Sequence, residues 1–156
     1  MFFCGRCFFI VDIIRWVQKG GIMAKKTRVY YGWAAFDEDA KKLARRIRRV
    51  GLPKNIYGKP RGGLILAVRL SHLLKRSMIL EEDQIGRDTL IVDDTCDTGA
   101  TLSRLANLTD YPIATLFNNE FRKIKVPRII YAQLTHGAWI VFPWESKRSS
   151  AVVDNT

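Results

Sequence analysis

Hydrophobic and polar residues alternate in short blocks along the chain, and these blocks predict strands and helices. Apolar residues at helical spacing predict an amphipathic helix over residues 37–50, with basic residues mostly on the opposite face. The acidic residues 37–39 suit its first turn, and Gly51 suits its end. A short strand and a glycine-rich turn are expected at residues 55–64, followed by an apolar helix that ends at Leu74. Further strands are expected at residues 77–82, 88–92, 113–117 and 129–132.

The strongest chemical signal lies at residues 90–102, LIVDDTCDTGATL. The three apolar residues predict the end of a buried strand, so Asp93 and Asp94 are expected where that strand meets solvent. A hydroxyl-rich turn follows, and a helix is expected to begin at Thr101. Backbone N–H groups of such a turn can bind a phosphate, while the carboxylates accept hydrogen bonds from ribose hydroxyls. An isolated Asp-Asp pair could simply end a strand, but the whole ordered run favours a site for a phosphorylated sugar.

A second candidate anion-binding turn is formed by Arg61, Gly62 and Gly63, between an expected strand and an expected helix. The turn does not match the P-loop, in which a lysine follows the glycines and precedes serine or threonine. The alternative is a plain strand–turn–helix junction in which glycine allows close packing. Taken alone, the turn leaves both interpretations open.

Length and composition predict one globular domain, expected at residues 23–147. The chain has 156 residues, of which 47% are hydrophobic and 26% charged, enough for a sizeable core without disulfides. Its formal net charge of +11 would attract anions such as phosphorylated substrates, nucleic acid or a membrane surface. Much of this charge falls on the helix expected at residues 37–50, where a solvated helix face is preferred to a nucleic-acid surface.

Residues 1–22 differ in character from the rest of the chain. They are apolar but too short and too charged for a membrane span, and they do not resemble a secretory signal. Met23 begins a sequence typical of a cytoplasmic N-terminus, so residues 1–22 are expected to be an extension outside the fold, for example from an over-called start codon. The alternative is an amphipathic segment that docks on a membrane or a partner. Residues 148–156 are expected to form a tail.

The three cysteines fit a reducing cytoplasm. Cys4 and Cys7 have the Cys-x-x-Cys spacing, but no second pair follows, so a zinc site or a redox motif is weakly supported. Cys96 is interpreted as a small spacer within the acidic run.

Three motifs together resemble one enzyme family. Residues 90–102 resemble the phosphoribosyl pyrophosphate (PRPP) motif of type I phosphoribosyltransferases: an apolar strand, two acidic residues and a Thr-Gly-x-Thr-like loop. The Arg61-Gly62-Gly63 turn resembles the pyrophosphate loop of that family, and residues 139–145, WIVFPWE, resemble the C-terminal hood of its small xanthine–guanine and hypoxanthine members. The family order across residues 29–145 implies an α/β fold: a twisted, mainly parallel sheet flanked by helices, with a small hood from both chain ends.

The resemblance also implies roles for individual residues. Asp93 and Asp94 would hold the ribose and help retain Mg²⁺, and Asp97 would be the catalytic residue that manages the proton on purine N7. The residues implied to bind the ribose and 5′-phosphate of PRPP are Asp93, Asp94, Thr95, Asp97, Thr98, Gly99, Ala100 and Thr101. Those implied to bind pyrophosphate are Arg61, Gly62 and Gly63, and the family's unusual cis peptide would fall at Pro60–Arg61.

Base binding is implied for the hood and for the end of the strand at residues 113–117. Trp139 would stack on the base while backbone groups of Ile140 read its edge. Relatives that bind 6-oxopurines commonly place a lysine after that strand, whereas this chain has Asn119, which can donate a hydrogen bond but adds no charge. The remaining hood aromatics, Phe142 and Trp144, are interpreted as core residues.

The predicted function is transfer of the 5-phosphoribosyl group from PRPP to a nucleobase, a purine by resemblance, giving a nucleoside 5′-monophosphate and pyrophosphate with Mg²⁺ as cofactor. The alternative is a PRPP-sensing regulator of the same fold that binds nucleic acid through its basic face. A homodimer is usual for such families, and a cytoplasmic location is expected. The link at residues 83–87 is short, so closure over the site is expected to be modest or to come from the partner subunit.

Overall fold

The computed structural model describes residues 27–145. The expected extension at residues 1–22, the tail at residues 148–156 and the Cys4–Cys7 pair lie outside the described residues, so they stay predictions. Within residues 27–145, no helix combines the length and the apolar character that crossing a membrane requires.

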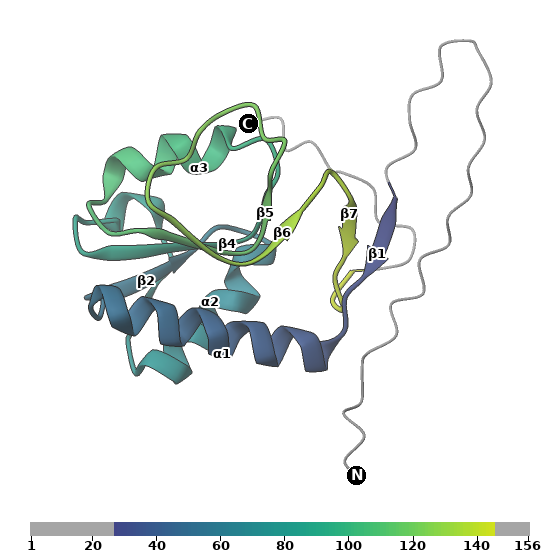
Figure 1. Cartoon of the computed structure of the whole chain (residues 1–156). Helices are drawn as coiled ribbons and strands as arrows, with labels where there is room; N and C mark the ends of the chain where they lie inside the picture. The colour runs from purple at the N-terminus through teal and green to yellow at the C-terminus, as the bar shows by residue number, and fades with distance from the viewer. Residues whose placement is uncertain (1–26, 146–156) are drawn as a thin grey trace, which may run out of the picture.

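A five-stranded, all-parallel sheet forms the centre of the molecule (Figure 1). The strands run in the spatial order β3-β2-β4-β5-β6. Their bounds are β2 Asn55–Gly58, β3 Met78–Ile79, β4 Thr89–Cys96, β5 Ile113–Asn119 and β6 Ile129–Thr135. The central strand β4 therefore has a neighbour on each side, and its carboxyl end lies at the edge where parallel α/β sheets bind ligands.

Helices cover both faces of the sheet. Figure 1 shows α1 (Trp33–Val50) and α2 (Gly62–Leu74) on one face and α3 (Ala100–Leu105) on the other. Two short 3₁₀ helices, η1 (Glu82–Gln84) and η2 (Ala106–Leu108), complete the connections. The fold is the α/β arrangement that the resemblance implied.

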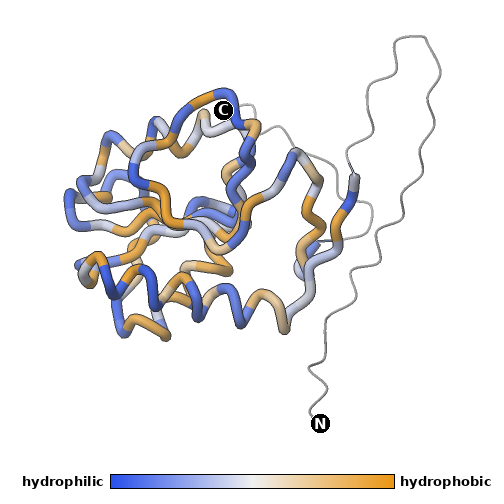
Figure 2. Tube along the Cα trace, viewed as in Figure 1, coloured by the Kyte–Doolittle hydropathy of each residue, from blue (hydrophilic) through white to orange (hydrophobic). Residues whose placement is uncertain are grey.

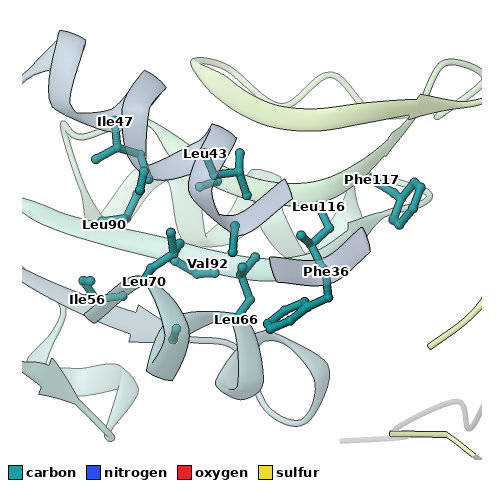
Figure 3. Close-up of a cluster of buried hydrophobic side chains, with 14 of the residues drawn as sticks. Phe36, Leu43, Ile47, Ile56, Leu66, Leu70, Leu90, Val92, Leu116 and Phe117 are labelled. Atoms are coloured by element: carbon teal, nitrogen blue, oxygen red, sulfur yellow. The ribbon is translucent and has the colours of Figure 1, made fainter. Parts of the chain in front are cut away.

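The residues of β4 alternate between two hydrophobic cores. Leu90 and Val92 pack with α1 and α2 in the larger core (Figure 3), whereas Ile91 packs with α3 and η2 in the smaller one. All three side chains are fully buried. A parallel strand covered on both faces requires an unbroken apolar run, and the sequence supplies one here. Figure 2 shows hydrophobic and hydrophilic residues in alternation along α1, as expected for a helix with one face on the core.

A second, two-stranded sheet stands beside the main one. It pairs β1 (Arg28–Tyr30) with β7 (Trp139–Val141) in parallel register. This small sheet is the hood expected from both ends of the chain (Figure 1). Aromatic side chains attach it to the main body: the ring of Phe117, on β5, lies 5.0 Å from that of Tyr31 and 5.9 Å from that of Phe142. Phe142 and Trp144 are thus core residues, as predicted.

Several element boundaries differ from the prediction. Helix α1 begins at Trp33 rather than at residue 37, so no acidic residue lies in its first turn. Strand β3 spans two residues instead of six, and η1 occupies part of the expected strand and link. Strand β4 continues through Asp93 and Asp94 to Cys96, so the acidic pair lies inside the strand and is partly buried, not at its solvent border. Pairing with β5 through Thr95 and Cys96 carries the strand past the acidic residues.

Strands β5 and β6 are also longer than expected, and α3 begins at Ala100, one residue early. The basic face of α1 was expected to be solvated, but two of its arginines bind other parts of the fold. Arg46 donates to the carbonyl of Tyr131 and Arg48 to that of Leu73. These two arginines hold α1 against its neighbours in addition to contributing charge.

A buried carboxylate ties the hood to the body. Asp39, on α1, accepts hydrogen bonds from the hydroxyl of Tyr31 at 2.8 Å and from Lys42 at 2.8 Å, and it also accepts from the amide of Gln133. Tyr31 directly follows β1, and Gln133 lies in β6. Burial and the nearby Asp39 raise the pKa of the Tyr31 phenol, which therefore stays a hydrogen-bond donor.

Replacing Asp39 with leucine should lower the free energy of unfolding by about 2–4 kcal/mol, because the buried hydroxyl of Tyr31 and the amide of Gln133 lose their acceptor. Urea denaturation measures the change. The control is Glu38→Gln, an exposed acid on the same helix, which should change the free energy by less than about 0.5 kcal/mol. Equal stability of Asp39→Leu and wild type would show that the hydrogen bonds of Asp39 do not anchor the hood.

Candidate active site

The two predicted phosphate-binding motifs touch each other. Asp93 and Asp94 lie in the carboxyl-terminal half of β4 and pack against the turn that begins α2. A Cβ atom built on Gly62 would lie 1.7 Å from Oδ2 of Asp94, and one on Gly63 would lie 2.5 Å from the carbonyl oxygen of Val92. A side chain at Gly63 would collide with the backbone of β4, and one at Gly62 would displace the carboxylate of Asp94.

Burial raises the pKa of both acidic residues. For Asp93, burial is the main cause and the adjacent charge of Asp94 adds to it. For Asp94 the pKa rises to about 6, mainly through burial, with a further contribution from the nearby carboxylate of Glu145 and an opposing one from the backbone N–H of Thr95. Such a crowded acidic pair attracts cations and hydroxyl donors.

The loop after β4 is held from the opposite side by the β5–β6 loop. The backbone N–H of Ile124 donates to the carbonyl of Thr98 at 3.0 Å. Gly99 has a φ of 85°, and a Cβ atom there would lie 2.2 Å from the carbonyl oxygen of Ile124. Glycine is thus required both by backbone conformation and by contact. The loop leaves Thr98 and Thr101 exposed, as expected for residues that would surround a phosphate.

The remaining members of the predicted phosphate site lie in the same segment. Thr95 is the last residue but one of β4, and Ala100 is the first residue of α3 and is exposed. Asp97 is partly buried in the bend between β4 and α3. The structure therefore brings all the predicted PRPP residues together at the carboxyl end of one strand.

At the turn before α2, the peptide bond between Pro60 and Arg61 is cis, as the resemblance implied. The Arg61 side chain is exposed and forms no ion pair with any residue in the range 27–145. Lys59 lies close enough to Asp93 and Glu82 for its positive charge to act on the pKa of both carboxyls. Its effect is a small lowering in each case, and the pKa of Asp93 stays raised because burial outweighs it. The turn thus carries Lys59 near the acidic pair and an exposed guanidinium at Arg61.

The predicted base-binding residues come from β5 and β7. Trp139 is partly exposed at the start of β7, and Ile140 is buried with its backbone in register with Val29 of β1. Asn119 is buried at the end of β5, and its side-chain amide donates to Oδ1 of Asp97 at 2.7 Å. Asn119 is therefore in direct contact with the candidate catalytic acid.

Sequence reasoning missed three contributors to the site: Lys59, Glu145 and the β5–β6 loop. Lys59 and Glu145 lie within motifs that the sequence singled out, but their proximity to the acidic pair depends on the packing of separate elements. No motif in the sequence marks the loop. It belongs to the site because Ile124 contacts the turn at Gly99.

Comparison with known proteins finds purine phosphoribosyltransferases among the relatives of this chain. Xanthine-guanine phosphoribosyltransferase of Nitratidesulfovibrio vulgaris is 29% identical over 137 residues, covering 74% of this chain and 83% of the relative. The crystal structure of a purine phosphoribosyltransferase from Pyrococcus horikoshii superposes with a TM-score of 0.62 at 30% identity, covering 76% of this chain and 95% of that one. The chain belongs to the purine phosphoribosyltransferase family.

Another solved structure shares the fold of this phosphoribosyltransferase domain. Xanthine-guanine-hypoxanthine phosphoribosyltransferase of Helicobacter pylori gives a TM-score of 0.63 at 19% identity, covering 77% of this chain and 93% of that one. No family model matches the chain. The family assignment of this phosphoribosyltransferase therefore rests on similarity to individual relatives over about three quarters of the chain.

Replacing Gly62 with alanine should disrupt the acidic pair of this phosphoribosyltransferase, because the added methyl group occupies the position of the Asp94 carboxylate. We expect PRPP affinity to fall at least about 10-fold, equivalent to 1.4 kcal/mol or more, as measured by calorimetric titration. The matched control is Gly86→Ala, whose methyl group would meet only the hydroxyl of Thr89 at 3.9 Å. Unchanged PRPP affinity in Gly62→Ala would contradict the contact.

Replacing Asp94 with asparagine should stabilise the protein without PRPP and divalent cations at pH 8. The pKa of Asp94 in the folded state, about 6, exceeds the unfolded value of 3.8, so its contribution to stability is present below about pH 4 and is lost as the pH rises through 6. The variant should gain about 1–3 kcal/mol at pH 8 and little at pH 4. Thermal unfolding in EDTA at both pH values measures this, and equal gains at both would contradict the assignment.

Proposed function

We propose that the protein transfers the 5-phosphoribosyl group of PRPP to a purine base, producing a nucleoside 5′-monophosphate and pyrophosphate. The observation that supports this most directly is the contact between the acidic pair and the glycine turn. It joins a site suited to ribose hydroxyls with a site suited to pyrophosphate, which are adjacent groups in PRPP. Family membership adds independent support.

In this proposal the ribose 5-phosphate lies along the end of β4. Asp93 and Asp94 accept hydrogen bonds from the 2′- and 3′-hydroxyls, and the loop at residues 97–101 surrounds the 5′-phosphate with backbone N–H groups and the hydroxyls of Thr98 and Thr101. The contact with Ile124 holds the loop in place before substrate arrives. Preorganisation of this kind lowers the entropy cost of binding.

Pyrophosphate occupies the turn before α2. The guanidinium of Arg61 is exposed and can form paired hydrogen bonds with phosphate oxygens, while the backbone of Gly62 and Gly63 permits close approach. Lys59 adds a second positive charge near the acidic pair. Both cations stabilise negative charge that grows on the leaving group as the bond at C1′ breaks.

The donor set also fits Mg²⁺. Within residues 27–145 no group of three or more His, Cys, Asp or Glu side chains is arranged to hold a metal ion. Asp93 and Asp94 would be the protein's contribution, because their carboxylate oxygens suit a hard cation, and the other ligands would be substrate oxygens and water, which is the usual manner of Mg²⁺ binding. When bound, the cation supplies positive charge that offsets the repulsion within the pair and within the pyrophosphate.

The base lies between the hood and the end of β5. Trp139 supplies a flat surface for stacking and the backbone of Ile140 reads the ring edge, while Asn119 at the end of β5 faces Asp97. Bond breaking at C1′ leads, pyrophosphate leaves with the bonding electrons, and a ring nitrogen of the base then forms the new bond to C1′. Asp97 accepts the proton that the base gives up from N7 as this bond forms.

A cytoplasmic location and a homodimer belong to the same proposal. The thiol of Cys96 is buried and forms no disulfide with the residues in the range 27–145, and burial raises its pKa to about 11, which fits the role of a spacer. Nucleic acid is not favoured as the main ligand, since the charges of Lys41 and Lys42 are paired with acids of the same helix.

The proposal is tested by incubating the protein with PRPP, Mg²⁺ and single bases and measuring pyrophosphate release. We expect release that depends on a purine. Asp97→Asn should lower kcat about 100-fold or more while sparing PRPP binding, and the double substitution Asp93→Ala, Asp94→Ala should abolish PRPP binding. No release with any purine or pyrimidine would contradict the transferase and favour the PRPP-sensing regulator.

A further inference from the structure

We propose that Asn119 is a positioning residue that orients the carboxylate of Asp97 for proton transfer from the base. This inference rests on the proposed function and adds a residue to its catalytic machinery. It also assigns Asn119 a role through Asp97 in place of a primary contact with the base.

The hydrogen bonds of Asn119 define which way its amide points. Its Oδ1 accepts from the backbone N–H of Phe121 at 3.0 Å, and its Nδ2 donates to Oδ1 of Asp97 at 2.7 Å. A backbone N–H can only donate, so the oxygen must face Phe121 and the nitrogen must face Asp97. The amide therefore acts as a bridge of fixed direction between a main-chain donor and the candidate catalytic acid.

The two partners differ in how firmly the fold holds them. Asn119 is 7% exposed and is the last residue of β5, in register with Thr135 of β6. Asp97 lies in the bend after β4, just beyond the last paired position, Cys96 with Asn118. A residue anchored in the sheet thus fixes a side chain in a loop. The 2.7 Å bond restricts rotation of the Asp97 carboxylate.

Such restriction matters because proton transfer depends steeply on geometry. A misplacement of about 1 Å at a catalytic group can reduce the rate about 100-fold. Functional groups held by a supporting hydrogen bond on a regular element keep their orientation better than those on loops alone. Loss of the bond should therefore lower kcat and leave substrate binding largely intact.

The decisive variant is Asn119→Asp, which keeps the shape and the acceptor for Phe121 but replaces the donor toward Asp97 with a second carboxylate. We expect kcat to fall at least about 10-fold while the KM values for PRPP and base change less than about two-fold. In an Asp97→Asn background the same substitution should cause no further loss, because the group through which it acts is gone. A persistent loss in that background, or a raised KM for base with kcat preserved, would overturn the proposal in favour of direct base contact.

Stability provides a readout that does not depend on turnover. Asn119→Asp alone should lower Tm by about 3 °C or more, whereas the pair Asp97→Asn, Asn119→Asp restores an amide–carboxylate hydrogen bond with the roles exchanged and should recover that loss. Recovery supports the contact even if the wild-type protein releases no pyrophosphate, a result that would count against the transferase alone. Additive losses in Tm would overturn the proposal.

The matched control is Asn118→Asp, the same chemical change one residue earlier on the opposite face of β5. Its Oδ1 accepts from Arg122 at 3.0 Å, and a carboxylate can accept the same bond. We expect its effects on kcat and Tm to add to those of Asp97→Asn. Coupling of equal size at both asparagines would overturn the specific pairing with Asp97.

Discussion

The packing of the Asp93–Asp94 pair against the Gly62–Gly63 turn is the contact on which the site depends. It joins the carboxyl end of β4 to the start of α2 so closely that a methyl group at either glycine would collide with β4. The arrangement costs stability, because two carboxyls of raised pKa are crowded together. A site that binds a polyhydroxylated, phosphorylated ligand with a cation is a physical reason for retaining that cost.

The surrounding structure holds this contact from three sides. Strand pairing extends β4 past the acids, the β5–β6 loop supports the turn at Gly99, and the hood brings Glu145 near Asp94. The hood itself is fixed by aromatic contacts with Phe117 and by the buried carboxylate of Asp39. The rigid sheet and its attachments therefore position groups that come from four separate segments of the chain.

Much of the fold and most of the site motifs were predictable because their signals are local. The apolar run before Asp93, the glycines after Arg61 and the aromatic segment at Trp139 each reflect a local requirement. What the sequence could not predict depends on register between distant segments. Strand β4 extends through the acids because β5 pairs with it, and Asn119 reaches Asp97 only because β5 lies beside β4. Helix α1 begins at Trp33, earlier than its acidic residues indicated, and the hood residue Trp144 packs on Trp33 and Phe36 of its first turn.

In the proposed mechanism, one PRPP molecule binds across the acidic pair and the glycine turn. Calorimetric titration of the protein with PRPP and Mg²⁺, without any base, measures this binding. We expect saturable binding of one PRPP per chain that weakens sharply when Mg²⁺ is removed. Absence of binding, or binding that the double substitution Asp93→Ala, Asp94→Ala leaves unchanged, would contradict it.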